Sequence, residues 1–562
     1  MRREVSVVNK KFSSFPILFA LLALLIGTCA VVFPASAQAA PTSTGSITVS
    51  GTVASSYDAY QIFSADVVDG DSDAKIATDL AWTSDAARDA VLPVLHSAGM
   101  PNSQTTAQEA AEWLNSDSHL TSALSAQLAR SLQSSDAVSV ALNAGTVAEL
   151  PCGYWLIVAK DDAISQNEAG TAPIMALVGG SAVTVKPKAA TPKVSKHVLE
   201  DSTAAWQKAA DATVADDLYW RLSATVPAGL TAYDTYTVRF VDTMSAGLDP
   251  SRVAASMRVY VATGADGGFD AVATGKDGRA GTEPAQGWTD ITAQCATKVA
   301  ADGTFTVRTG DLIAALGGAD AFTAGARVVA VYDAPLNSAC NHGIAKGNPN
   351  EVYLRYPRSP FADQSGDAGF TRTPSDDACA YTWDLALTKR GSDGDKPLAG
   401  AVLSIADDRG RTLAADGTWD AEGKATVTTG EDGRVTVSGV DSGKLEVREL
   451  KAPKGYTAFE GMRSVTVKAE GLDIDQVVAA KPKLTITAES PLRADSADGS
   501  TGSLEASLIN TPTGTPPSIT TGGFMPSTGD MAMYAAAAAA VAGAALIVVA
   551  LLVKRGGGSH KE

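Results

Sequence analysis

Short runs of alternating apolar and polar residues, separated by Gly and Asp turns, recur along most of the chain. Residues 47–49 and 60–63 are early examples, and residues 431–433 (Glu-Asp-Gly) form a typical turn. Alternation with a period of two predicts half-buried β-strands, and many short strands at close spacing are typical of β-sandwiches. The pattern therefore predicts an all-β protein built from immunoglobulin-like sandwich domains in tandem.

A helical pattern interrupts the strands near the start of the chain. Thr106 and Glu109 have the spacing of a capping box, and a leucine recurs at every fourth position from Leu120 to Leu132. Both features are typical of amphipathic helices. We therefore expect a helical insertion in the first domain, with its leucines in the core.

Length and composition indicate three domains and two terminal segments. The chain has 562 residues, which is enough for about three domains of ordinary size. Its formal net charge of -17 argues against binding to nucleic acid. The predicted ranges are a first domain with the helical insertion at 40–190, a second domain at 191–374, a third domain at 375–510 and a Pro/Thr/Gly linker at 511–524.

Two long apolar segments lie near the ends of the chain. Residues 15–33 follow several basic residues and precede small-residue cleavage sites, so residues 1–39 are expected to be a signal peptide. Residues 533–553 are long enough to cross a hydrocarbon core ~30 Å thick, and the following Lys554 and Arg555 would stay in the cytoplasm. The pattern predicts an exported protein whose C-terminal segment is a transmembrane helix.

Four cysteines remain after the predicted signal peptide, and an even number in an exported protein permits disulfides. Three pairings can be drawn, and Cys295 with Cys340 is the pair we favour. No Cys or His spacing resembles a metal site. No cofactor is expected, and the sequence contains no nucleophile elbow, zinc-protease helix or phosphate-binding loop, so we do not expect an enzyme.

Three polar residues of the third domain lie in phase with apolar neighbours that should form the core. They are Lys389, Glu449 and Asn510. Lys389, for example, shares its strand face with Leu385 and Leu387. Because side chains two positions apart point to the same side of a strand, this phase predicts that all three polar groups are buried.

The second domain repeats this pattern with Lys196, Asp242 and Asn350. Lys196, for instance, is in phase with Val194 and Val198. For a single lysine, a strand-end residue whose tip reaches water would be the simpler interpretation. Two sets of lysine, acid and asparagine favour a chemical role.

Burial disfavours charge, so a buried lysine tends toward the free amine and a buried acid toward the carboxylic acid form. A free amine can attack the side-chain carbonyl carbon of asparagine and expel ammonia, while the acid donates a hydrogen bond to the carbonyl oxygen and relays protons. The product is an uncharged isopeptide crosslink. The sequence therefore predicts self-modification rather than turnover, with Asp242 and Glu449 as the promoting acids.

These residues lie in motifs that resemble those of Gram-positive backbone pilins, the shaft subunits of sortase-assembled pili. The third domain is similar to a collagen-adhesin B-type (Cna B-type) module at residues 387–389, 396–401 and 447–456. The last of these segments resembles the pilin E-box, with Leu445 and Leu450 departing from its usual Tyr and Thr. The resemblance implies that Glu449 is the catalytic acid.

The second domain is similar to the isopeptide-forming middle domain of such shafts, at residues 240–244 and 348–354. The resemblance implies crosslinks of Lys196 with Asn350 and of Lys389 with Asn510. Asn348 is the weaker candidate because Pro349 separates it from the strand. In the first domain no lysine occurs between the predicted signal peptide and Lys75, so no crosslink is expected there.

The pentapeptide before the C-terminal apolar segment resembles the Leu-Pro-x-Thr-Gly signal that sortases cleave between Thr and Gly. It consists of Met525, Pro526, Ser527, Thr528 and Gly529. Met replaces the usual Leu, and the two side chains have similar volume. The resemblance implies a class C pilin sortase, a housekeeping sortase and final attachment to peptidoglycan at the cell surface.

The end of the first domain, residues 183–188, resembles the pilin motif whose last lysine attacks the sortase-bound Thr of the next subunit. That lysine would be Lys188, and Lys186 and Lys193 remain alternative acceptors. The expected partners are identical subunits joined head to tail, ancillary pilins and a host surface ligand if one exists. A monomeric wall-anchored adhesin or an ancillary pilin is the alternative, because it would keep the sorting signal without an acceptor lysine.

Overall fold

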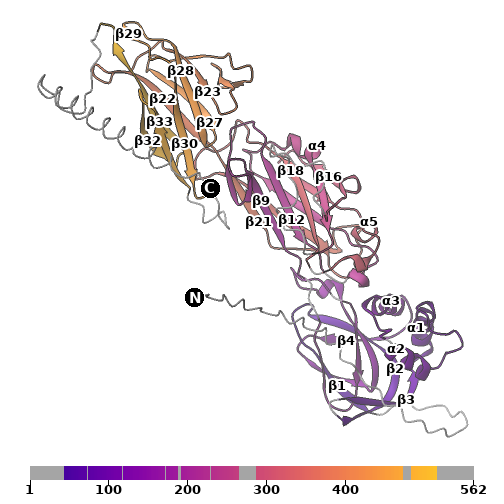
Figure 1. Cartoon of the computed structure of the whole chain (residues 1–562). Coiled ribbons are helices and arrows are strands. Elements are labelled where there is room, and N and C mark those ends of the chain that lie inside the picture. Colours follow the sequence, from indigo (N-terminus) through magenta and orange to yellow (C-terminus); the bar gives the residue numbers. More distant parts are fainter. Residues whose placement is uncertain are drawn as a thin grey trace, which may run out of the picture.

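Three strand-rich domains follow one another in an elongated arrangement (Figure 1). The all-β, multi-domain architecture agrees with the sequence-based prediction. The computed structural model describes residues 43–71, 74–116, 118–170, 172–187, 191–227, 230–264, 287–323, 325–472 and 482–514. The segments predicted as signal peptide (1–39), sorting signal (525–529) and transmembrane helix (533–553), most of the 511–524 linker, and Lys188 lie outside these ranges.

Within the described ranges, no helix is long and apolar enough to cross a membrane.

Two sheets form the first domain. One has the strand order β5-β1-β8, and the other has the order β3-β2-β6-β7, with β4 also pairing with β2. The strands are β1 (Thr44–Val49), β2 (Ser56–Asp69), β3 (Lys75–Trp82), β4 (Ser139–Asn143), β5 (Val147–Pro151), β6 (Gly153–Ala159), β7 (Ile174–Val178) and β8 (Val183–Val185). Because β8 is the last strand of this domain, the predicted acceptor segment begins within that strand and continues directly after it.

The predicted helical insertion consists of α1 (Asp85–Ser97), α2 (Ala107–Asn115) and α3 (Ser122–Gln133). Thr106 and Glu109 form the expected capping box at the start of α2. The leucines of α3 are buried against the sheet, as their spacing predicts. The insertion begins earlier than expected, because α1 contains Pro93, a residue that argues against a helix interior.

The second domain is a sandwich of two sheets. Their orders are β10-β9-β12-β18-β14-β15 and β11-β21-β19-β13-β17-β16, with β20 also pairing with β19. The strands are β9 (Val194–Glu200), β10 (Ala205–Gln207), β11 (Ala209–Asp211), β12 (Tyr219–Thr225), β13 (Arg239–Met244), β14 (Arg258–Ala262), β15 (Thr289–Asp290), β16 (Ala296–Val299), β17 (Thr304–Arg308), β18 (Arg327–Asp333), β19 (Asn348–Pro357), β20 (Phe370–Arg372) and β21 (Asp376–Tyr381). Two single-turn helices lie in connections between its strands: α4 (Val253–Ser256) between β13 and β14, and α5 (Leu312–Ala315) between β17 and β18.

The boundary between the second and third domains differs from the prediction. It was expected at residue 375, but β21 pairs with β19 and with β11 and so completes a sheet of the second domain. The third domain therefore begins after Thr382. Alternation alone could not separate β21 from the next strand, since only one residue lies between them.

The third domain is also a two-sheet sandwich, with the orders β27-β22-β33-β29 and β25-β24-β23-β28-β30-β31; β32 also pairs with β33, and β26 with β23. Its first and last strands are parallel neighbours. The strands are β22 (Trp383–Gly391), β23 (Val402–Ala406), β24 (Thr412–Leu413), β25 (Trp419–Asp420), β26 (Val427–Thr428), β27 (Arg434–Val440), β28 (Gly443–Lys451), β29 (Tyr456–Thr457), β30 (Met462–Glu470), β31 (Lys483–Ala488), β32 (Leu492–Asp498) and β33 (Ser503–Pro512).

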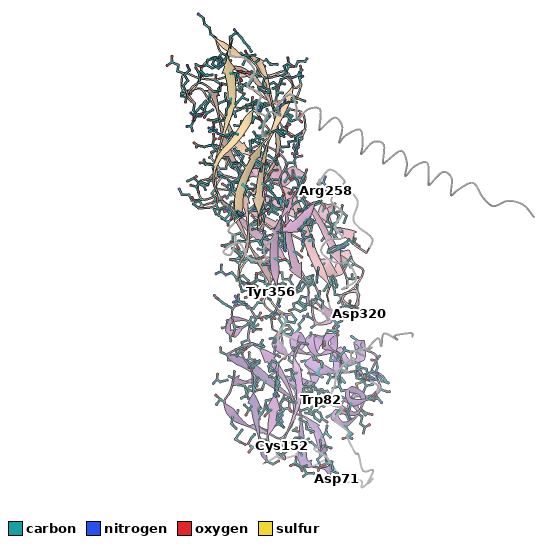
Figure 2. The ribbon with its side chains drawn as sticks, turned by 60° about the vertical axis from the view of Figure 1, so that its left-hand side comes forward. Asp71, Trp82, Cys152, Arg258, Asp320 and Tyr356 are labelled. Carbon is teal, nitrogen blue, oxygen red and sulfur yellow. The ribbon has the colours of Figure 1, made fainter. Side chains whose placement is uncertain are left out.

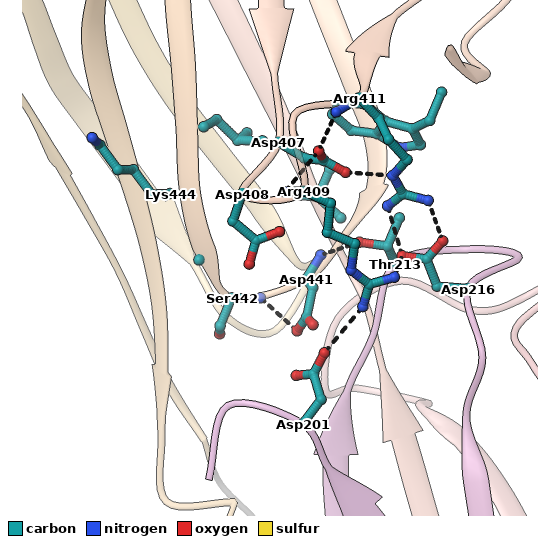
Figure 3. Close-up of a pocket in the computed structure, with 14 residues that line it drawn as sticks. Asp201, Thr213, Asp216, Asp407, Asp408, Arg409, Arg411, Asp441, Ser442 and Lys444 are labelled. Carbon is teal, nitrogen blue, oxygen red and sulfur yellow. Dashed lines mark hydrogen bonds and ion pairs between the residues drawn. The ribbon is translucent and has the colours of Figure 1, made fainter. Parts of the chain in front are cut away.

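Charged contacts join the second and third domains (Figure 3). The guanidinium of Arg411 pairs with Asp216 and also with Asp407, at 2.6 Å. Arg409 reaches Asp201 of the second domain at 3.3 Å. These ion pairs connect a loop of the third domain to two loops of the second, and they define a joint between the two bodies.

Buried carboxyl groups line the same joint. Asp211 accepts hydrogen bonds from the indole of Trp383 at 2.5 Å and from the backbone of Ser442 at 3.0 Å. Burial and the nearby Asp211 raise the pKa of Glu200 to about 7, and burial also raises the pKa of Asp441. Burial at the joint therefore favours the protonated forms of Glu200 and Asp441.

Candidate functional site

Three strands bring the predicted residues of the third domain together in its core. Lys389 lies on β22, Glu449 on β28 and Asn510 on β33. The parallel register of β22 and β33 pairs Gly391 with Asn510, which sets the asparagine beside the end of the strand that carries the lysine. The first and last strands of this domain thus meet at the predicted crosslink.

One carboxylate of this triad touches both prospective partners. The amide Nδ2 of Asn510 donates to both Oε1 and Oε2 of Glu449, each at 2.9 Å. The Nζ of Lys389 lies 3.5 Å from Oε1. The Lys389 and Glu449 side chains have no exposed surface, and Asn510 is only 2% exposed. Burial lowers the pKa of Lys389 to about 8, so the free amine is accessible near neutral pH.

The second domain holds its own triad on β9, β13 and β19. Lys196, Asp242 and Asn350 each have 0% exposure. The Nζ of Lys196 donates to Oδ2 of Asp242. Burial lowers the pKa of Lys196 to about 8, and burial raises the pKa of Asp242 to about 6. Both shifts favour the neutral forms that attack on an amide requires.

A fourth residue, Tyr332 on β18, connects this triad. Its hydroxyl accepts hydrogen bonds from Nζ of Lys196 and from Nδ2 of Asn350, both at 2.9 Å, and it donates to Oδ2 of Asp242 at 3.2 Å. The sequence did not reveal this role, because Tyr332 continues an apolar row with Val328 and looks like an ordinary core residue. Hydrogen bonds between side chains of different strands do not alter the alternation of apolar and polar residues within one strand.

Both asparagines have a buried carbonyl oxygen without a hydrogen-bond partner. These atoms are Oδ1 of Asn350 and Oδ1 of Asn510, and Oδ1 of Asp242 is also unpartnered. An unpartnered buried oxygen is costly. A protonated acid that donates to the amide oxygen would remove that cost and would also make the amide carbon more electrophilic. The two sites thus have the groups that amide formation requires.

Asn348, the weaker candidate, has a different role. Its Oδ1 accepts from the backbone of Asn341 at 2.8 Å, and its Nδ2 donates to the carbonyls of Asn341 and Ala380. Every polar atom of this side chain is therefore used to hold a loop. None of the described hydrogen bonds of Asn348 goes to Lys196.

Lys75 of the first domain is buried without an asparagine partner. Its Nζ donates to the carbonyl oxygens of Gly179 and Ser181, and it lies 3.5 Å from Asp69. These contacts close the end of the sheet. The arrangement is that of a satisfied structural lysine.

The expected disulfide is not formed. Cys295 and Cys340 are free, as are Cys379 and Cys152, the last of which lies in the first domain (Figure 2). Cys295 follows a helical turn and Cys340 lies in a loop near Asp384 of the third domain, and both thiols are partly buried. Burial raises the pKa of both thiols to about 11, which makes them poor nucleophiles.

No group of three or more His, Cys, Asp or Glu side chains in the described part of the chain is arranged to hold a metal ion.

Lys186 and Lys193, the alternative acceptors, are exposed on either side of the junction between the first and second domains. The junction itself is held by Arg130 of α3, which pairs with Asp234 at 3.2 Å and lies over the ring of Phe361. Lys186 and Lys193 therefore lie next to a junction that is held by side-chain contacts between the two domains.

Residues 384–481 match the family model of the SpaA prealbumin-like fold domain. The trypsin-resistant surface T6 protein of Streptococcus pyogenes is 31% identical over 134 residues, which is 22% of this chain and 23% of the relative. The sequence match therefore spans about a quarter of the length of that curated relative.

Several solved structures of backbone or major pilins cover most of the chain. The T6 backbone pilin of serotype M6 Streptococcus pyogenes has 15% identity and a TM-score of 0.46, with coverage of 85% of this chain and 100% of that chain. The full-length major pilin SpaD from Corynebacterium diphtheriae has 15% identity and a TM-score of 0.41, with coverage of 84% and 99%. The match to the prealbumin-like fold model lies within the third domain. The chain is similar to backbone pilins of Gram-positive bacteria, as its sequence motifs predicted.

Proposed function

We propose that the chain is a structural subunit of a covalently polymerised surface pilus. The observation that carries this proposal is the pair of buried triads, Lys196 with Asp242 and Asn350, and Lys389 with Glu449 and Asn510. Burying an amine, an acid and an amide together is costly, and a reaction that turns the amine and the amide into an uncharged bond removes that cost. A fibre under tension is a setting in which irreversible crosslinks inside each domain are useful.

Each internal bond forms without a cofactor. The proton of the buried ammonium passes to the carboxylate, which leaves a free amine and a carboxylic acid. The amine nitrogen attacks the asparagine Cγ, the bond from Cγ to Nδ2 breaks, and the departing nitrogen takes up a proton and leaves as ammonia. The acid is regenerated, and the net change is the loss of one ammonia for each bond. Proximity in the folded core makes the attack intramolecular and so supplies much of the rate.

Subunits would be joined by a sortase. The enzyme cleaves the bond between Thr528 and Gly529 and passes the Thr carbonyl to Lys188 of the next subunit. A contact of this head-to-tail kind does not close on itself, so it produces a filament. The last subunit would be transferred to peptidoglycan, and ancillary pilins or a host surface ligand would add adhesion to the fibre.

The test is an immunoblot of cell wall released by a muralytic enzyme and boiled in detergent. Wild type is expected to give a ladder of high-mass bands. Lys188→Ala and Thr528→Ala should both abolish the ladder, whereas Lys186→Ala, which removes a neighbouring exposed lysine, should retain it. A single monomer-sized wall band in wild type would instead indicate a solitary anchored adhesin. Loss of the ladder in Lys186→Ala but not in Lys188→Ala would show that Lys186, and not Lys188, is the acceptor lysine.

A further inference from the structure

The two triads differ in the atom that lies between the lysine and the asparagine. In the third domain this atom is Oε1 of Glu449, which is 2.9 Å from the Asn510 amide nitrogen and 3.5 Å from the Lys389 amine. In the second domain the acid is Asp242, whose side chain is shorter by one methylene. The described hydrogen bonds connect Asp242 to Asn350 only through the hydroxyl of Tyr332.

From this difference we infer that Tyr332 is a catalytic residue of the second-domain crosslink and relays a proton from Lys196 to the departing nitrogen of Asn350. The inference rests on the proposed function, because it concerns the same bond. Its physical basis is that the reaction must move one proton from Nζ to Nδ2, and the Tyr332 oxygen is 2.9 Å from each of these atoms. Its hydroxyl therefore bridges the proton donor and the proton acceptor.

The steps balance as follows. Asp242 first takes the ammonium proton through its direct contact with Nζ. A protonated Oδ2 is a poor acceptor, which releases the Tyr332 O–H to turn toward Nδ2. When Nζ bonds to Cγ, the phenol oxygen takes the surplus proton of Nζ and gives its own proton to Nδ2, and the Cγ–Nδ2 bond breaks. The released ammonia takes the proton from Asp242 and leaves as ammonium, so that Tyr332 and Asp242 return to their starting states.

The surroundings hold the phenol in this position and keep it protonated. Tyr332 is 0% exposed and packs edge-on against Phe305, with ring centroids 4.8 Å apart. The register of β12 and β18 places it opposite Trp220, and the Lys196 amine lies 5.5 Å from both aromatic ring centres. Burial raises the pKa of Tyr332 well above its ordinary value, so the hydroxyl is a proton carrier and not a phenolate.

The experiment follows bond formation over time in the full-length chain. The chain is produced in a host without sortases, labelled in a short pulse, chased, extracted in detergent and digested. Mass spectrometry then quantifies the crosslinked Lys196–Asn350 peptide and, as an internal reference, the Lys389–Asn510 peptide. Tyr332→Phe removes only the hydroxyl. Tyr356→Phe is the matched control, because Tyr356 is buried in the same core (Figure 2) with a hydroxyl that has no partner.

In the Tyr332→Phe chain, the Lys196–Asn350 bond is expected to form about 100-fold more slowly, the lower end of the range for general acid–base catalysis. The Lys389–Asn510 bond and the Tyr356→Phe chain should be unaffected. Formation of the Lys196–Asn350 bond at the wild-type rate in Tyr332→Phe overturns the inference. Absence of both bonds in wild type overturns the proposed function itself, so the two failures are distinguishable.

A second variant separates chemistry from packing. In a Tyr332→Phe chain that also carries Asp242→Glu, the longer acid should reach Asn350 as Glu449 reaches Asn510, and the rate should recover at least tenfold. A packing defect would not be repaired by a longer acid, so no recovery overturns the inference. If Tyr332→Phe does not fold, 3-fluorotyrosine at this position keeps the shape and makes the phenol more acidic. A several-fold change in rate then supports the relay, and an unchanged rate overturns it.

Discussion

Replacing Glu449 by Gln should prevent the crosslink of the third domain without changing the volume of its core. The side-chain amide of the introduced Gln cannot accept the proton of Lys389 or give a proton to Asn510. Both of these residues contact the Glu449 carboxylate in the structure. The chain should therefore retain the mass of one ammonia. Glu446→Gln is the control, because Glu446 lies on the same strand and its partner is the exposed Lys444.

The loss of stability can be worked out from the loop that the bond closes. Lys389 and Asn510 enclose a loop of about 120 residues, and in the chain-entropy model a crosslink of that span stabilises the folded state by about 5 kcal/mol. For a domain of about 130 residues, each kcal/mol corresponds to a shift of roughly 3 to 4 °C in the melting temperature. The third domain should therefore melt about 15 to 20 °C lower in Glu449→Gln. The loss of the buried carboxylate partner of Lys389 would lower the melting temperature further.

Differential scanning calorimetry of the full-length chain, with intact mass measured on the same sample, is the assay. The melting temperature of the third domain should fall, and that of the second domain should be unchanged. A gain of one ammonia without a fall in melting temperature would refute the chain-entropy reasoning. An unchanged mass would show that Glu449 does not promote the bond.

Three further outcomes are expected. Asp242→Ala should restore the mass of one ammonia and remove only the crosslinked peptide of the second domain from a tryptic digest. The rate of that bond in chain refolded from inclusion bodies should be bell-shaped in pH: it should fall below a pH of about 6, where Asp242 and Lys196 are both protonated, and above about 8, where both have lost their protons. At the joint between the second and third domains, the pKa of Glu200 is raised to about 7. A carboxyl with a raised folded-state pKa stabilises the joint below its unfolded pKa of about 4.3, and this contribution is lost as the pH rises through the folded value. Trypsin should therefore cut after Arg409 or Arg411 in the joint faster at mildly alkaline than at mildly acidic pH, once the rate at each pH is divided by that on an unfolded substrate, and equal corrected rates would contradict this account.

The triads could be predicted from the sequence because each member lies in a strand with one buried face. A polar residue in phase with Leu385 and Leu387 must enter the core, whatever the rest of the fold does. The same phase argument applies to Lys389 and to its counterpart Lys196, and both are fully buried. It works only where a strand has a clear inside and outside.

Other features depend on contacts between distant segments and were missed for that reason. Tyr332 is in phase with apolar neighbours, and only the approach of β18 to β9 and β19 shows that its hydroxyl is shared. The ion pair of Arg411 with Asp216 joins two loops of different domains, so the alternation of apolar and polar residues along the strands could not predict it. The expected disulfide of Cys295 with Cys340 rested on counting alone, which cannot place two residues in space.

The position of the crosslinks follows the path that tension would take through the proposed fibre. Force from the neighbouring subunit would enter at Lys188, pass along the chain to Lys196 and cross to Asn350. It would then run through β21 and β22 to Lys389 and cross to Asn510, from which the linker leads to the next subunit. The proposed bonds would thus exclude roughly 270 residues from the load, which would otherwise extend by on the order of 900 Å. The first domain precedes the entry point, so it would carry no tension, and a chain built this way needs no crosslink there.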